Sequence, residues 1–177
     1  DKLCPILKPD KDAASYRPIF LQNIIFKIID RILDARIRKL LKQRRGLHDE
    51  QGGFRRGRGT NEQFFVLRES LCLNKKLFIA FIDVKSAFDR AQRAFILKKL
   101  RQKGIDGKLW RIIRNTYRDT SVSIHDDLTS CLLEILCGVR EGGNSSPLLF
   151  NIFFDELVSE LKNSGFDFDE KKKSNIN

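Results

Sequence analysis

The feature that most constrains this chain is an apolar run that reads Leu-Phe-Ile-Ala-Phe-Ile from Leu77 and ends at Asp83 and Val84. An extended segment with large apolar side chains on both faces must be covered on both sides. The run therefore predicts a fully buried central strand. A carboxylate at its end is costly to desolvate unless a cation or a metal ion neutralises it. For Asp83, a metal ligand and a structural salt bridge both stay open on this pattern.

Helical periodicity predicts most of the other elements. Apolar residues recur at helical spacing from Asn23 to about Gln43, and Asn23 is the expected N-cap. Further helices are expected at about 60–73, 86–103, 107–118 and 147–161, and strands at 3–7, 120–125 and 131–136, with ordered structure resuming at 16–19. Asp89 falls in the third helix, where a helix-surface acid is favoured over a second metal ligand.

Composition and charge indicate a globular chain with a polyanionic partner. Hydrophobic residues make up 41% of the 177 residues and charged residues 32%, which argues against disorder. The formal net charge is +11, which favours a nucleic acid over an acidic protein partner or mere solubility. Part of this charge lies in residues 31–59, where cations at 31, 36, 38, 39, 42, 44, 45, 55, 56 and 58 face acids only at 34, 49 and 50.

No window approaches the roughly 18 apolar residues that span a bilayer, so no membrane partner is expected. The chain begins at Asp1 and contains no Met, so its genuine N-terminus and any targeting signal are expected to be missing. The cysteines form no CxxC pair and lie apart from both histidines, which argues against zinc. Reduced, mostly buried thiols in an intracellular protein are the expectation.

The segment Gln51–Gly59 combines four glycines with Arg55, Arg56 and Arg58. Its backbone can approach a ligand closely, and the arginine fork matches phosphate oxygens. The segment is not a P-loop, because the GK[ST] ending is absent. Phosphate contact is favoured, and a flexible, solvated basic loop is the alternative.

Four blocks, in order, carry a family resemblance. They are YRPIFLQNIIFKIIDRILDARI (16–37), QGGFRRGRGTNEQFFVL (51–67), LFIAFIDVKSAFDR (77–90) and CGVREGGNSSPLLFNIFFDEL (137–157). The chain resembles the reverse transcriptases of non-LTR retroelements and, more distantly, those of group II introns. The resemblance implies an α+β (mixed α/β) fold that forms a partial right-hand polymerase. Residues 1–75 would be fingers-like, 76–165 an incomplete palm, and 166–177 a charged, disordered tail.

The resemblance also implies roles at the nucleotide. Asp83 would be the first catalytic aspartate of the palm and a ligand of Mg²⁺. Phe88 would lie under the incoming sugar and exclude a 2′-hydroxyl, with core packing as its alternative role. Arg17 would contact the triphosphate, assisted by Lys8.

On the nucleic-acid side, Arg55, Arg56 and Arg58 would contact template or nucleotide phosphates. Gly142, Ser146 and Pro147 match the turn that lies against the base pair and the template. The implied partners are an RNA template, an RNA/DNA hybrid and deoxynucleotide triphosphates, and a second chain that completes the palm is a further candidate.

Two departures from the family pattern matter. Glu141 stands where the family has a nucleotide-contacting Gln, and Ser145 stands where an apolar residue is usual. A carboxylate about 4 Å from a phosphate charge would be repelled by ~4 kcal/mol at an effective dielectric near 20. The family's Tyr/Phe-x-Asp-Asp hairpin does not follow the 147–161 helix, and Phe168-Asp169-Glu170 is a poor substitute. Two-metal transfer needs carboxylates from both elements.

These observations predict a fragment of an RNA-directed DNA polymerase that is truncated before the hairpin and inactive alone. The alternative is a non-catalytic RNA-binding or assembly component of a ribonucleoprotein derived from a retroelement. A relic with no present role is a third reading.

Overall fold

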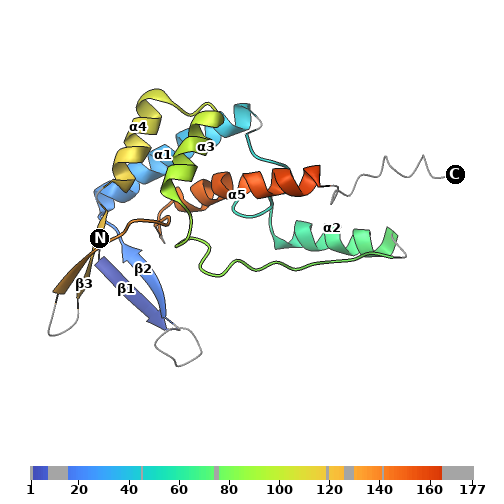
Figure 1. Ribbon diagram of the computed structural model, residues 1–177, viewed down its shortest axis with the longest axis horizontal. Helices are drawn as coiled ribbons and strands as arrows, with labels where there is room; N and C mark the ends of the chain where they lie inside the picture. The colour runs from blue at the N-terminus through green and yellow to red at the C-terminus, as the bar shows by residue number, and fades with distance from the viewer. Residues whose placement is uncertain are drawn as a thin grey trace.

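The computed structural model describes residues 2–7, 16–44, 46–73, 76–118, 120–125, 130–140 and 142–164. In chain order, the elements in these ranges are β1 (Lys2–Leu7), β2 (Tyr16–Leu21), α1 (Ile24–Gln43), α2 (Thr60–Leu73), α3 (Arg93–Gln102), α4 (Gly107–Tyr117), β3 (Ser121–His125), β4 (Ser130–Glu134) and α5 (Ser146–Asn163). Figure 1 shows α1, α3, α4 and α5 gathered into one body, with the sheet at one end and α2 beside the far end of α5.

The sheet has the strand order β2-β1-β3-β4. β1 pairs antiparallel with β2, from Lys2 opposite Leu21 to Leu7 opposite Tyr16. β1 also pairs parallel with β3 through Lys2 and Ser123, and β3 and β4 form the expected antiparallel hairpin. The two hairpins are therefore joined across the sheet by strands that are distant in the sequence.

The hydrophobic core lies where α1, α3, α4 and α5 meet. Its fully buried members are Ile37, Leu41, Ala91, Ile96, Leu100, Ile105, Ile113, Val139, Leu148, Leu149 and Ile152. α2 contributes no buried residue. The core thus depends on four helices and on the loop residues that connect them.

Most predicted helices are confirmed within a few residues. The side chain of Asn23 accepts a hydrogen bond from the backbone N–H of Ile25 at 2.9 Å, so Asn23 is the N-cap of α1. α3 begins at Arg93 rather than near Ser86. Residues 85–90 form turns instead, and Ser86 adopts a φ of 53°, a left-handed value that a helix cannot continue.

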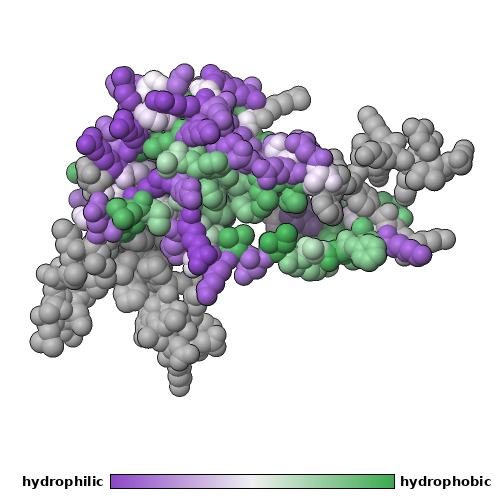
Figure 2. All heavy atoms as spheres, in the orientation of Figure 1, coloured by the Kyte–Doolittle hydropathy of each residue, from purple (hydrophilic) through white to green (hydrophobic). Residues whose placement is uncertain are grey.

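The predicted buried strand at 77–84 is wrong. Residues 77–84 belong to no strand, and Phe78 and Phe81 are 101% and 85% exposed. A strand requires a hydrogen-bonding neighbour, and no described strand pairs with this segment. The apolar pattern indicated a need for cover but could not specify which segment provides it. Figure 2 shows hydrophobic residues gathered over α2 and the segment that follows it.

The expectation of mostly buried thiols is also wrong for the two described cysteine side chains. Cys72 and Cys137 are both exposed. Cys72 lies on α2, whose side chains pack against no core, and Cys137 lies in the loop before α5. None of the helices in the described ranges is long and apolar enough to cross a membrane.

Candidate functional site

The four sequence blocks converge on the N-terminal half of α5. Asp30 in the first block binds Ser145 at the start of this helix. Gln51 in the second block binds the carbonyl of Asn151, and Phe88 in the third packs on Phe150. We refer to this half-helix, residues 145–155, as the α5 junction.

The turn before α5 is held by α1. The carboxylate of Asp30 accepts a hydrogen bond from the backbone N–H of Ser145 at 3.1 Å and a second from the Ser145 hydroxyl. Both residues are buried. Gly142 has a φ of +94°, which favours glycine, and Pro147 is in the first turn of α5. Gly142, Ser146 and Pro147 are thereby fixed in one short segment, and their contact with template stays a prediction.

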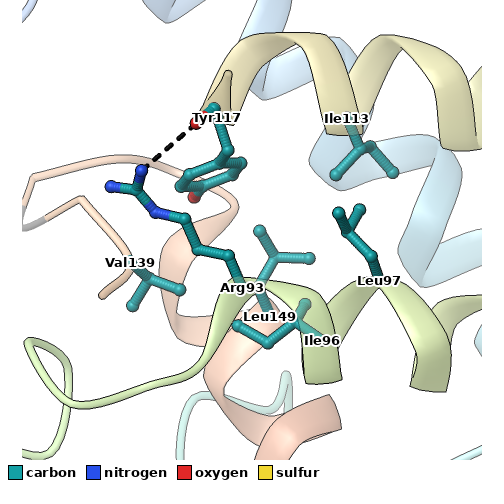
Figure 3. A pocket seen from close by; sticks show the side chains of 7 residues that line it. All are labelled: Arg93, Ile96, Leu97, Ile113, Tyr117, Val139 and Leu149. Carbon is teal, nitrogen blue, oxygen red and sulfur yellow. Dashed lines mark hydrogen bonds between the residues drawn. The ribbon is translucent and has the colours of Figure 1, made fainter. Parts of the chain in front are cut away.

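Two arginines, Arg93 and Arg140, lie against the ring of Tyr117, with guanidinium carbons 5.3 Å and 5.7 Å from its centroid; Figure 3 shows Arg93. Arg93 donates to the carbonyls of Gly138 at 2.9 Å, Ile135 at 2.6 Å and Tyr117 at 3.2 Å. Arg140 donates to the carbonyl of Thr116 at 2.9 Å. Burial lowers the pKa of both guanidinium groups and raises the pKa of the Tyr117 hydroxyl. Arg93 and Tyr117 also line a small pocket whose other lining residues are aliphatic: Ile96, Leu97, Ile113, Val139 and Leu149.

The Gly/Arg loop is tied to α5 from both sides. The side-chain N–H₂ of Gln51 donates to the Asn151 carbonyl at 3.1 Å and to the Asp155 carboxylate at 3.0 Å. In return, the Asn151 side chain donates to the carbonyl of Gly53 at 2.8 Å. These hydrogen bonds anchor the start of the loop to α5, while most of its later residues are exposed.

Two of the three loop arginines stabilise the loop itself. Arg55 donates to the carbonyls of His48 at 2.6 Å and Gln51 at 3.2 Å. Arg58 pairs with the Asp49 carboxylate at 2.8 Å. Arg56 is exposed and makes no hydrogen bond or ion pair with another described residue. Of the three, Arg56 is the best placed to meet a phosphate, and this role stays a prediction.

A buried acid at the other end of the junction, Asp155, was not foreseen from the sequence. Lys103 donates to its carboxylate at 2.5 Å and to the carbonyl of Gly46 at 2.5 Å, and the backbone N–H of His48 donates to it at 2.9 Å. Burial alone would raise the pKa of the Asp155 carboxyl. The hydrogen bonds from Lys103 and His48 outweigh burial and hold that pKa below its usual value. Asp155 thus joins α3, α5 and the segment before the loop.

Phe88 lies at the meeting point of three blocks. Its ring centroid is 6.1 Å from that of Phe54 in the Gly/Arg loop and 5.1 Å from that of Phe150. Its carbonyl accepts a hydrogen bond from the backbone N–H of Val139 at 2.9 Å. The core-packing role is therefore observed, and a contact with the sugar of a nucleotide stays a prediction.

Asp83 makes no hydrogen bond or ion pair with the described residues of this junction. It is exposed and pairs with no cation among the residues that the structure describes. Within the same residues, no group of three His, Cys, Asp or Glu side chains could hold a metal ion. Lys8 and Glu141 lie outside the described residues. Arg17 is placed only by its backbone, in β2 opposite Ile6 of β1.

Comparison with known proteins identifies the family. Residues 6–172 match the family model of the reverse transcriptase (RNA-dependent DNA polymerase). The chain is 32% identical over 162 residues to the Pol polyprotein of retrotransposable element R2 from Nasonia vitripennis, covering 88% of the chain and 15% of that protein. It is 31% identical over 163 residues to the RNA-directed DNA polymerase of mobile element jockey from Drosophila funebris, covering 88% of the chain and 18% of that protein.

The chain therefore spans less than a quarter of the length of these curated relatives. The relatives are non-LTR retrotransposon proteins, which confirms the resemblance seen in the four blocks. The chain belongs to the reverse transcriptase (RNA-dependent DNA polymerase) family, of the non-LTR retrotransposon type.

Proposed function

We propose that this chain supplies the fingers and the first palm elements of an RNA-directed DNA polymerase of α+β, right-hand architecture. In this assignment, residues 1–75 belong to the fingers and 76–165 to an incomplete palm. The reaction is the transfer of a deoxynucleotide to a primer 3′-hydroxyl on an RNA template. One observation carries the proposal: residues that are 100 and 115 positions apart meet at the α5 junction, within the stretch that matches the family model.

Asp83 is the residue that we assign to the metal. A carboxylate oxygen suits Mg²⁺, which takes few protein carboxylates together with substrate phosphates. Asp83 is exposed and unpaired among the described residues, so it is available as a ligand. When bound, Mg²⁺ would supply charge neutralisation at the transferred phosphoryl group. Two-metal transfer needs carboxylates from a second element besides that of Asp83, so we expect the chain to be inactive on its own.

The nucleotide would be oriented by side chains of the junction. The half-buried ring of Phe88 is fixed between Phe54 and Phe150, so it offers a rigid surface to a sugar. Gly142, Ser146 and Pro147 would lie against the base pair, because Asp30 holds their turn in place. Arg17, Lys8 and Arg56 would neutralise phosphates, and Glu141 would weaken triphosphate binding relative to a Gln.

Primer extension tests the proposal. The chain replaces the matching 162-residue stretch of the R2 protein from Nasonia vitripennis, and extension of a DNA primer on RNA is measured with Mg²⁺. We expect activity that Asp83→Asn reduces by at least about 10³-fold. Asp89→Asn, six residues on and also exposed, is the matched control and should retain activity. A chimera that is folded but indifferent to Asp83→Asn would refute the assignment, and extension by the 177-residue chain alone would refute its incompleteness.

A second candidate function is RNA binding without catalysis. The net charge of +11 and the exposed cations of α1, α3 and α4 favour it. It predicts Mg²⁺-independent RNA binding by the chain together with a chimera that binds a primer–template but does not extend it. Loss of RNA binding with retained extension would exclude this candidate.

A further inference from the structure

The helices α3 and α4 and the turns that flank them carry a strongly one-sided charge. Residues 93–118 hold a single acid, Asp106. Their nine cations are Arg93, Lys98, Lys99, Arg101, Lys103, Lys108, Arg111, Arg114 and Arg118. Lys99 and Lys103 pair with acids of α5, and Arg93 binds carbonyls. These three cations belong to the structure of the helical body.

Five of the remaining cations are exposed and form no ion pair with another residue that the structure describes: Lys98, Arg101, Lys108, Arg111 and Arg114. Lys108, Arg111 and Arg114 follow at three-residue steps along one side of α4. We call these five residues the α3–α4 cation surface. Figure 2 shows hydrophilic residues dominating the outer face over α3 and α4.

Trp110 draws the cations of the two helices together. The guanidinium carbon of Arg101 lies 3.7 Å from the centroid of the Trp110 ring, and that of Arg114 lies 5.7 Å from it. The indole N–H donates to the carbonyl of Leu97 at 2.8 Å, which fixes the ring. An arginine held by an aromatic ring instead of a carboxylate keeps its N–H donors for another acceptor. The planar arginine fork matches phosphate oxygens.

The cations of α1 are arranged differently. Arg31 lies among the exposed isoleucines Ile28, Ile29 and Ile32, so that face mixes charge with apolar surface. Arg38 is paired with Asp34 on its own helix. Arg36, Lys39 and Lys42 of α1 are exposed and form no ion pair with a described residue, but no aromatic ring gathers them, so α1 serves as an internal comparison.

We infer that the α3–α4 cation surface binds the phosphate backbone of single-stranded RNA, independently of sequence and outside the polymerase site. In Figure 1, the segment that leaves α2 and carries Asp83 runs below α5, whereas α3 and α4 lie above it. The choice of RNA rests on the proposed function, because charge alone fits any polyanion. The surface would hold a transcript on the protein at a place distinct from the primer terminus.

Fluorescence anisotropy of a labelled oligouridine of about 20 nucleotides tests the inference on the intact chain, between about 50 and 200 mM salt. One variant carries Arg101→Gln, Lys108→Gln, Arg111→Gln and Arg114→Gln. A matched variant removes the same charge from α1 through Arg31→Gln, Arg36→Gln, Lys39→Gln and Lys42→Gln. Circular dichroism confirms that both variants are folded.

We expect the α3–α4 variant to lose roughly 100-fold in affinity near 0.1 M salt, and its log–log salt slope to decrease by about 2 to 3, at ~0.7 for each phosphate contact. The α1 variant should change the salt slope by less than the ~0.7 expected for one phosphate contact. Equal losses in both variants, or no loss in the first, would overturn the inference. If polyglutamate bound as tightly as the oligouridine and lost as much affinity in the α3–α4 variant, the assignment to RNA would be overturned.

The chimera separates this inference from the proposed function. Lost RNA binding in the α3–α4 variant together with Asp83-dependent extension supports both. Asp83-dependent extension without RNA binding at α3–α4 overturns this inference alone. RNA binding at α3–α4 in a chimera that never extends a primer supports the inference and refutes the catalytic proposal.

Discussion

The carboxylate of Asp30 accepts hydrogen bonds from both the backbone N–H and the hydroxyl of Ser145, a residue 115 positions further along the chain. This pair joins α1 to the turn that precedes α5. At the position where the resemblance implies an apolar residue, Ser145 supplies a hydroxyl donor to a buried acid. Without those donors, the buried carboxylate would carry a large desolvation cost.

We therefore expect Asp30→Ala to destabilise the fold. The change removes the acceptor of two buried donors and lowers the free energy of unfolding by about 2–3 kcal/mol. Urea denaturation measures this difference. Asp34→Ala, which removes an acid paired with Arg38 on the same helix, is the control and should cost about 0.5 kcal/mol. Similar costs at both positions would show that the Asp30 contact adds nothing beyond a helical ion pair.

Gly138→Ala should disrupt the contact between the third and fourth blocks. Gly138 has a φ of +84°, and a Cβ there would lie 2.8 Å from the Asp89 carbonyl oxygen and 3.0 Å from that of Phe88. These are backbone atoms that cannot rotate away, so we expect a loss of about 2 kcal/mol or more in the free energy of unfolding. Gly53→Ala, where no atom lies within 4 Å of the added Cβ, is the control. Equal urea midpoints for the two variants would contradict the prediction.

The loop arginines should separate into structural and exposed ones. Arg55→Gln loses two partly buried hydrogen bonds to carbonyls and should cost about 1–2 kcal/mol in the free energy of unfolding. Arg56→Gln should leave stability within about 0.5 kcal/mol, because its side chain is exposed. Thermal or urea unfolding of the pair measures the difference. An Arg56 effect as large as that of Arg55 would mean that the loop is built differently in solution.

The stability of the fold should depend on acid pH through Asp155. Its folded-state pKa is lower than its unfolded value, so the unfolded chain binds this proton more readily. The contribution is therefore complete well above the ordinary Asp pKa of about 3.9 and is lost as pH falls through the lowered folded pKa. Asp155→Asn should weaken the fall of the free energy of unfolding at acid pH. It should also lower that free energy by about 2–4 kcal/mol near pH 7, since Lys103 keeps a buried charge without its partner.

Urea unfolding between about pH 3 and pH 7 measures both effects. Glu156→Gln is the matched control, because Glu156 pairs with Lys99 on the same two helices but is partly exposed. If the free energy of unfolding of Asp155→Asn fell with acid pH as steeply as that of the unchanged chain, other carboxyls would cause the pH dependence.

The exposed segment 77–84 should be dispensable for stability but should promote self-association. Phe78→Lys with Phe81→Lys should change the free energy of unfolding by less than about 0.5 kcal/mol and reduce binding of an apolar dye such as ANS. Ile152→Ala, at a fully buried position in α5, is the contrasting variant and should cost about 2–5 kcal/mol. A large destabilisation by the double lysine variant would show that the segment is covered in solution.

Local patterns predicted the helices well because each is specified by its own residues. Asn23 provides the N-cap of α1. The spacing of Leu33, Ile37 and Leu41 specifies its buried face. The contacts that assemble the site are long-range, and only one kind of signal pointed to them. Asp30 continues the Leu33–Ile37–Leu41 stripe, and Asp155 continues that of Leu148 and Ile152. An acid in a core position of a helix predicts a buried partner.

The partner itself could not be read from the sequence. Nothing local to Asp30 indicates Ser145, and nothing local to Asp155 indicates Lys103. The burial of 77–84 was mispredicted for the same reason, since periodicity reports a preference for burial but not the segment that covers it. The roles of Asp83, Arg17 and Phe88 rest on the family resemblance, and the contacts among the described residues leave them untested.

The α5 junction has a consequence for how this chain can tolerate insertions. Each added residue turns an α-helix by about 100°. One extra residue between Ser145 and Asn151 would therefore rotate Phe150, Asn151 and Asp155 away from Phe88, Gln51 and Lys103 in a single step. A substitution removes one contact at a time, but a change of length here separates the second and third blocks from α5 together, while Asp30 still holds Ser145. The number of residues between Ser145 and Asp155 is therefore more tightly constrained than the identity of any one of them.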